Sequence, residues 1–163
     1  MKTAAFTPVT LAEAVSHLGS MPAFLAAVLA SVPPAELTRQ PQAGHFCLVE
    51  HACHLRDLEC EGYLVRVRRM LAEHEPALEP FDGDAVAAAR NYPSQDGFEA
   101  AREFAAARTE LLALVAPLTP AELAREGTFG DQRVCFADVI AMMVGHDREH
   151  REEIERLLAR LEG

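Results

Sequence analysis

The chain has 163 residues, half of them hydrophobic and a quarter charged, which is typical of one soluble globular domain over residues 1–163. Its formal net charge of −10 argues against nucleic acid or an anionic membrane as a partner. Lys2 is the only lysine, which excludes Schiff-base chemistry, and no nucleotide-binding or serine-hydrolase motif occurs.

Apolar residues recur at helical spacing in long segments that contain little glycine or proline. They predict helices over residues 11–29, 47–73, 84–90, 98–115 and 136–161. We expect Pro22 to kink or break the first helix, since an internal proline removes a backbone hydrogen bond. No segment alternates with a period of two, so no sheet is expected. The four long helices therefore predict an all-α fold, a four-helix bundle.

The second and last long helices are expected to begin in the same way. Cys47 precedes Glu50 by three residues, and Cys135 precedes Asp138 by three, so each pair resembles a capping box with cysteine in place of serine. The four cysteines form no CxxC pair, the N-terminus shows no signal pattern, and the apolar stretch 23–30 is too short to span a membrane. We expect a cytoplasmic protein with reduced thiols.

The seven histidines are grouped in a way that suggests a metal site. His146 and His150 are four residues apart on the last predicted helix, so that both imidazoles can face one ion. His51 and His54 lie near the start of the second long helix, and either could supply a third ligand. The apolar periodicity of that helix alone favours His51. Three imidazoles leave a coordination position open, as in catalytic metal sites.

Charged residues near these histidines are candidates for supporting roles. Glu50 and Asp57 are spaced to accept a ring N–H from His54. Glu149, which follows His146 by three residues, is our candidate catalytic base, with Glu153 as the alternative. Arginines on the second helix are expected either to bind a substrate carboxylate or to pair with glutamates; these are Arg56, Arg66, Arg68 and Arg69.

Two segments resemble the DinB/YfiT-like superfamily. Residues 44–59, with Phe46, Cys47 and Glu50 leading into His54-Leu55-Arg56-Asp57-Leu58-Glu59, are similar to its second-helix signature, which reads HLxDxE. Residues 130–154, with Phe136-Ala137-Asp138 and the later HxxxH, are similar to its final helix. Phe46 stands where the family often has tryptophan, and Cys47 where it often has serine or threonine. The HLxDxE pattern selects His54 rather than His51 as the third ligand.

The resemblance implies an up-down-down-up bundle in which His54, His146 and His150 bind a divalent metal ion, often zinc or nickel. It further implies an enzyme acting on a small-molecule substrate, either a transferase that uses a low-molecular-weight thiol or a hydrolase. The alternative is a non-catalytic bundle that binds a ligand or dimerises and keeps a structural or vestigial metal site. Since four-helix bundles dimerise readily, we expect a homodimer.

Overall fold

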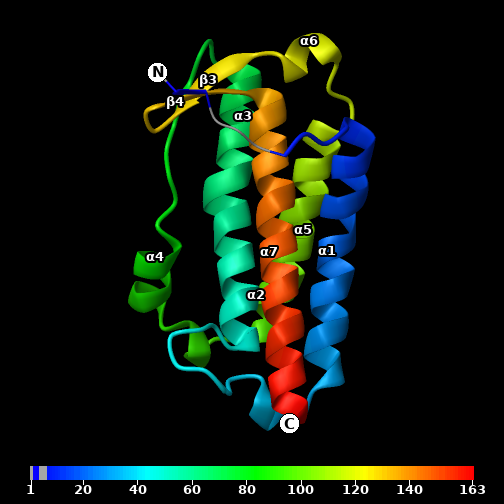
Figure 1. Cartoon of the computed structure of the whole chain (residues 1–163), viewed down its shortest axis with the longest axis vertical. Helices are drawn as coiled ribbons and strands as arrows, with labels where there is room; N and C mark the ends of the chain where they lie inside the picture. Colours follow the sequence, from blue (N-terminus) through cyan, green and yellow to red (C-terminus); the bar gives the residue numbers. More distant parts are fainter. Residues whose placement is uncertain (1, 4–6) are drawn as a thin grey trace.

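Four long helical rods run side by side in the computed structural model, which describes residues 2–3 and 7–163 (Figure 1). The first rod is α1 (Leu11–Ser31), the third is α5 (Gly97–Val115) and the fourth is α7 (Phe136–Glu162). The second rod consists of three consecutive segments, namely α2 (Leu48–Asp57), the π-helical turn η2 (Leu58–Tyr63) and α3 (Leu64–Ala72).

The direction of the rods confirms the predicted topology. In Figure 1 the first rod runs downward, the second and third run upward and the fourth returns downward, which is the up-down-down-up order. The second and third rods are therefore parallel, and the chain between them must travel the length of the bundle. It does so along the outside, where it forms the short helix α4 (Gly83–Arg90) beside the rods.

The helix ends follow from local hydrogen bonding. Backbone N–H groups of Cys47 and Cys135 donate to the side chains of Glu50 (2.7 Å) and Asp138 (2.8 Å), so that both predicted capping boxes are present. Pro22 lies inside α1, which continues to Ser31. Of the two expected effects of this proline, a kink or a break, the break is therefore wrong.

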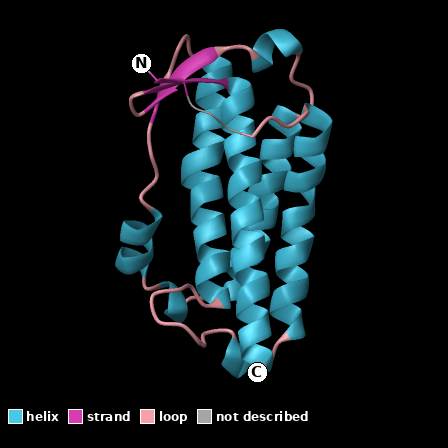
Figure 2. Cartoon of the chain, viewed as in Figure 1, coloured by secondary structure: helices cyan, strands magenta, loops and turns pink. Residues whose placement is uncertain are grey.

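A small sheet covers the upper end of the bundle, which corrects the prediction that the chain has no strands (Figure 2). The strands β1 (Lys2–Thr3), β2 (Ala77–Leu78), β3 (Glu126–Phe129) and β4 (Gln132–Cys135) lie in the order β1-β4-β3-β2. The pair β3–β4 is an antiparallel hairpin, and the two outer strands pair in parallel. Strands of two to four residues are too short to show an alternating pattern, which explains the error.

Three short helical segments complete the described chain. They are the 3-10 turns η1 (Pro34–Glu36) and η3 (Tyr92–Ser94) and the helix α6 (Pro120–Leu123). The first follows α1, the second leads from α4 into α5, and α6 lies between α5 and the hairpin. None of these segments interrupts the packing of the four rods, whose arrangement agrees with the predicted four-helix bundle.

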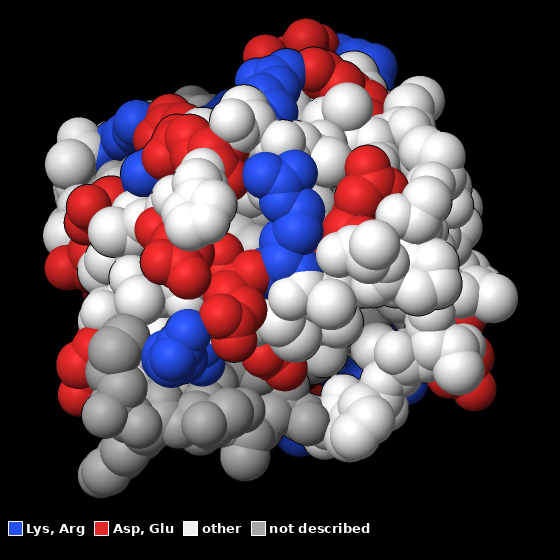
Figure 3. Space-filling view, turned by 90° about the horizontal axis from the view of Figure 1, so that it is seen from above, with Lys and Arg blue, Asp and Glu red and all other residues white. Residues whose placement is uncertain are grey.

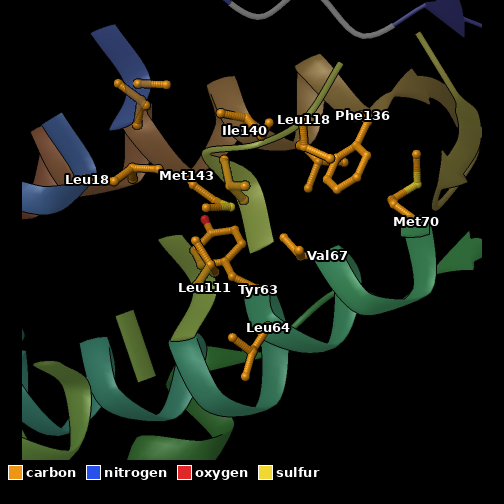
Figure 4. Packing of buried hydrophobic residues seen from close by; sticks show 14 of the residues in the cluster. Leu18, Tyr63, Leu64, Val67, Met70, Leu111, Leu118, Phe136, Ile140 and Met143 are labelled. Carbon is orange, nitrogen blue, oxygen red and sulfur yellow. The ribbon is translucent and has the colours of Figure 1, made fainter. Parts of the chain in front are cut away.

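The interior contains two apolar clusters separated by a polar layer. The upper cluster includes Leu18, Tyr63, Leu111 and Phe136 (Figure 4), and the lower cluster includes Met21, Leu48, Phe104 and Ile154. Buried polar residues lie between these clusters and beside the lower one. They include His51, His54, Glu59, Arg108, Asp147 and His150. The polar layer is where the candidate site lies.

Both signs of charge occur on the surface (Figure 3), although the chain as a whole is acidic. Figure 3 shows acidic and basic side chains interspersed over the end of the molecule that carries the sheet. By length and composition, α1 could cross a membrane, contrary to the expectation that no apolar stretch is long enough. In the bundle, however, α1 contributes buried residues to both apolar clusters, as a core helix of a soluble protein does.

Candidate metal centre

Three imidazoles from two rods converge in the polar layer. His54 comes from α2, and His146 and His150 come from successive turns of α7. The Nε2 atoms of His54 and His146 are 3.2 Å apart, and one ring nitrogen from each of the three residues lies within 4.8 Å of the others. The sequence pair HxxxH and the distant His54 are thus brought to a common point.

The donor set fits a divalent cation. With a zinc–nitrogen bond of about 2.1 Å, tetrahedral ligands lie about 3.4 Å apart, close to the 3.2 Å between the Nε2 atoms of His54 and His146. Burial lowers the pKa of His146 to about 3, and it also lowers the pKa of His54 and His150. All three rings are therefore neutral at pH 7 and keep a lone pair for a metal ion. Nδ1 of His54 is buried without a hydrogen-bond partner among the described residues.

His51 contacts one member of this group, His150. The two Nδ1 atoms are 3.0 Å apart, and Oε2 of Glu153 lies 3.4 Å from Nδ1 of His150. Burial lowers the pKa of His51 to about 3, so this contact joins two neutral rings and one must donate to the other. His51, His150 and Glu153 also lie close enough together to hold a cation. The structure thus brings both candidate third histidines to the site.

A cavity of about 520 Å³ opens onto these residues. Its walls come from the loop that precedes α2, from the first turns of α2, from α4 and from the C-terminal half of α7. The residues that line it are Gln40, Pro41, Gln42, Gly44, His45, Phe46, His51, His54, Asp84, His150, Glu153, Arg156, Leu157 and Arg160.

The backbone at the start of α4 packs closely against the His54 imidazole. A Cβ atom at Gly83 would lie 2.6 Å from Cε1 of His54, so only glycine allows this approach without a shift of the imidazole. The carboxylate of Asp82 caps α4 by accepting from the backbone N–H of Ala85. The start of α4 therefore forms one wall of the site and brings Asp84 to the cavity.

The carboxylates proposed from the sequence lie in different places. Glu149 is exposed and lines a second cavity of about 490 Å³, together with His146 and Tyr63, whereas Glu153 lines the first cavity. The histidine cluster therefore lies between the two cavities. Of the two candidate bases, Glu153 is the one in contact with a histidine of the trio.

Glu50 and Asp57 do not accept from a histidine ring, which corrects that expectation. Glu50 accepts from the Cys47 backbone and from Gln40. Asp57 accepts from Tyr92 Oη at 2.6 Å and is paired with Arg56 and Arg90. Both carboxylates are thus engaged in fixing the ends and packing of α2.

The four arginines singled out on the second rod are engaged outside the first cavity. Arg56, Arg68 and Arg69 pair with carboxylates, and Arg66 donates to the backbone carbonyl of Glu79. None of them is among the described residues that line the cavity. A substrate bound beside the imidazoles would therefore meet other arginines.

Sequence reasoning missed a buried ionic cluster beside the histidines. Arg108 of α5 binds Glu59 of η2 and Asp147 of α7 at 2.6–3.1 Å, and it also donates to the Leu18 carbonyl of α1. One guanidinium thus joins all four rods next to His146. The sequence did contain a sign that Arg108 is buried. It lies on the same helical face as Phe104, Leu111 and Val115, where a core residue is expected.

Comparison with known proteins gives one family and one fold. Residues 17–154 match the family model of the DinB superfamily. The solved structure of YfiT from Bacillus subtilis matches with a TM-score of 0.86 at 19% sequence identity, over 98% of this chain and 94% of that chain. YfiT is described as a probable metal-dependent hydrolase with an unusual four-helix bundle topology. None of the curated proteins compared with the chain matches it.

Proposed function

The chain belongs to the DinB superfamily, and from this we propose that it is a divalent-metal-dependent enzyme acting on a small molecule. One observation carries the proposal: His54, His146 and His150 offer ring nitrogens within 4.8 Å of one another beside a cavity. Three protein ligands leave a position for substrate or water, which is how catalytic sites differ from closed structural ones.

The proposed ion is zinc or nickel, because imidazole nitrogen suits both. When bound, such an ion supplies Lewis acidity, which lowers the pKa of a water or thiol and polarises a carbonyl. The chain's part is to hold three neutral imidazoles in fixed positions and to exclude bulk water. Gly83 allows α4 to close against His54, and Phe46 lies with its ring centroid 5.5 Å from that of the same imidazole.

The residue that transfers protons is chosen by which carboxylates line the cavity that holds the substrate. A substrate in the first cavity meets the carboxylates of Asp84 and Glu153, either of which can accept a proton from water and return it to a leaving group. Glu149 would take this role only for a substrate in the second cavity. We therefore favour Glu153, which contacts His150, over the residue that spacing alone suggested.

Hydrolysis is the reaction that these groups support best. A carboxylate beside an open position is what activation of water requires, and YfiT is described as a probable hydrolase. Transfer of a low-molecular-weight thiol asks for the same three ligands and is the second candidate, supported by the DinB-like motifs. A non-catalytic role with a bound metal is the remaining alternative.

Metal content tests the proposal first. Protein purified without chelators, or loaded with zinc or nickel, should hold about one ion per chain, and both His54→Ala and His146→Ala should lose it. His74→Ala, which changes an exposed histidine outside the cavity, is the matched control. A wild-type chain that takes up neither metal would refute the proposal.

Turnover then separates the reactions. Metal-loaded protein is assayed against a panel of esters and amides and, separately, against electrophiles supplied with a small thiol. Ester or amide cleavage that is lost in Glu153→Gln supports hydrolysis with Glu153 as the base. Thiol conjugation without cleavage supports the transferase. Bound metal without any turnover supports the non-catalytic alternative.

A further inference from the structure

The cavity beside the imidazoles extends along α7 toward its C-terminus. His150, Arg156 and Arg160 all line it, and Leu157, which is largely buried, lies between the two arginines. At 1.5 Å of rise per residue, the backbone of Arg156 is about 9 Å and that of Arg160 about 15 Å beyond His150 along the helix axis. The cavity therefore has two ends of different chemistry on one helix.

Its carboxylates are at the histidine end. Glu153 contacts His150, and Asp84 follows Gly83, which touches the His54 ring. The loop before α2 also lines the cavity, with His45 and with residues that carry no charge: Gln40, Pro41, Gln42, Gly44 and Phe46. Along α7, Arg156 and Arg160 are thus the charged lining residues beyond Glu153. Burial raises the pKa of Glu153, and Arg156 is close enough to that carboxylate to oppose the rise.

These two arginines are also the least engaged in the described part of the chain. Acidic residues outnumber lysine and arginine by 25 to 15, so most arginines find a carboxylate. Arg160 makes no hydrogen bond or ion pair with any described residue, and Arg156 reaches Glu152 only at 3.8 Å, with both side chains more than 60% exposed. The helix dipole favours a cation in the last turn of α7 but does not explain Arg156, one turn earlier.

We propose that Arg156 and Arg160 bind an anionic group, a carboxylate or a phosphate, at the far end of the substrate. Guanidinium groups suit both anions, because their N–H donors match the paired oxygens. The substrate is then an elongated molecule with its reacting group at the imidazoles, an apolar middle against Leu157 and an anionic end. This inference names the substrate class of the proposed enzyme and rests on that function.

Hydroxamates of increasing length test the proposal, because a hydroxamate binds an exposed zinc ion while its tail reaches along the cavity. Each ω-carboxylate is compared with the ω-amide of the same length by calorimetry on the zinc-loaded full chain. At one tail length the carboxylate should bind about tenfold more tightly than the amide, and an ω-phosphonate series shows which anion is preferred. The advantage should disappear in R156Q/R160Q and persist in R102Q, an exposed arginine of α5.

A second arm does not need the metal. Decanoate and decan-1-ol are compared on the metal-free chain, where the wild type should prefer decanoate and R156Q/R160Q should not. Equal binding of charged and neutral tails at every length, or an advantage that survives R156Q/R160Q, would overturn the proposal. Failure of acetohydroxamate to bind the zinc-loaded protein would instead count against the metal centre, while the metal-free arm still decides the role of the arginines.

Discussion

Replacing Arg108 with methionine should destabilise the protein severely, because it leaves two buried carboxylates without their cation. All five N–H groups of Arg108 are used: two reach Glu59, two reach Asp147 and one reaches the Leu18 carbonyl. The Arg108 and Glu59 side chains are 1% exposed and that of Asp147 is 6% exposed. Water therefore cannot replace the lost donors.

The magnitude follows from this burial. Removing one partner of a buried ion pair costs about 3–5 kcal/mol, whereas domains of this size are stable by only about 5–15 kcal/mol. The loss should also depend on pH. Burial raises the pKa of Glu59, and loss of the guanidinium raises it further. The folded variant then takes up a proton that the unfolded chain does not, so its deficit shrinks as the pH falls from neutral toward the usual pKa of glutamate.

Urea unfolding followed by circular dichroism, in the presence of a chelator, measures this prediction at several pH values. The triple variant Glu59→Leu/Arg108→Met/Asp147→Leu is the control, because replacing a whole buried ionic cluster by apolar residues is often neutral or stabilising. A loss below about 1 kcal/mol in the single variant, typical of an exposed pair, would show that the cluster is solvated and would refute the reasoning.

The remaining predictions concern the surroundings of the histidines. His51→Phe should weaken zinc binding about 10–100-fold, because it removes the partner of His150 Nδ1, and His51→Asn should weaken it less. A competitive chelator titration measures both zinc affinities. Affinities equal to that of the wild type would show that His51 plays no part in zinc binding. Gly83→Ala should also weaken metal binding, since its Cβ would displace His54, whereas Gly19→Ala meets only an ordinary contact at 3.7 Å and should not. Asp57→Asn should cost about 1–3 kcal/mol at neutral pH. Burial alone would raise the pKa of Asp57, but the bonds from Arg56, Tyr92 and Arg90 hold it below its usual range, so the difference from wild type should vanish in unfolding experiments as the pH falls through that lowered pKa. A difference that stays constant down to acidic pH would contradict this origin.

The long helices could be predicted because their buried apolar residues recur at helical spacing along the sequence. The short elements show no such repeat and could not be predicted. In α5, Phe104, Leu111 and Val115 are spaced for one face, and that face is buried. The same spacing includes Arg108, but an arginine is normally taken as a surface residue. Its burial depends on partners from the three other rods. The sheet likewise depends on contacts between strands of two to four residues that are far apart in sequence.

The histidines of the site could be predicted from the sequence, but the carboxylate beside them in the cavity could not. The spacing of His146 and His150 places both on one helix face, and the family resemblance selected His54, which the structure brings to them. Periodicity selected His51, and it too reaches the cluster through His150. Which carboxylate faces the cavity depends on how α7 is rotated against α2, and spacing along one helix does not determine that rotation. Glu149 and Glu153 consequently line different cavities.

The charges around the centre explain how this fold could bury a divalent ion on neutral ligands. Three imidazoles leave the ion's double charge uncompensated, and burying such a charge is costly. Burial lowers the pKa of His146 and Arg108 adds to this effect, so the cluster of Arg108 with Glu59 and Asp147 does not supply the compensating charge. Asp84 and Glu153 instead place two carboxylates at the cavity. These anions offset the ion's charge from outside the trio, so they leave the open coordination position available. A carboxylate among the three ligands would neutralise part of the charge directly, but it would also reduce the polarisation of whatever binds at that open position.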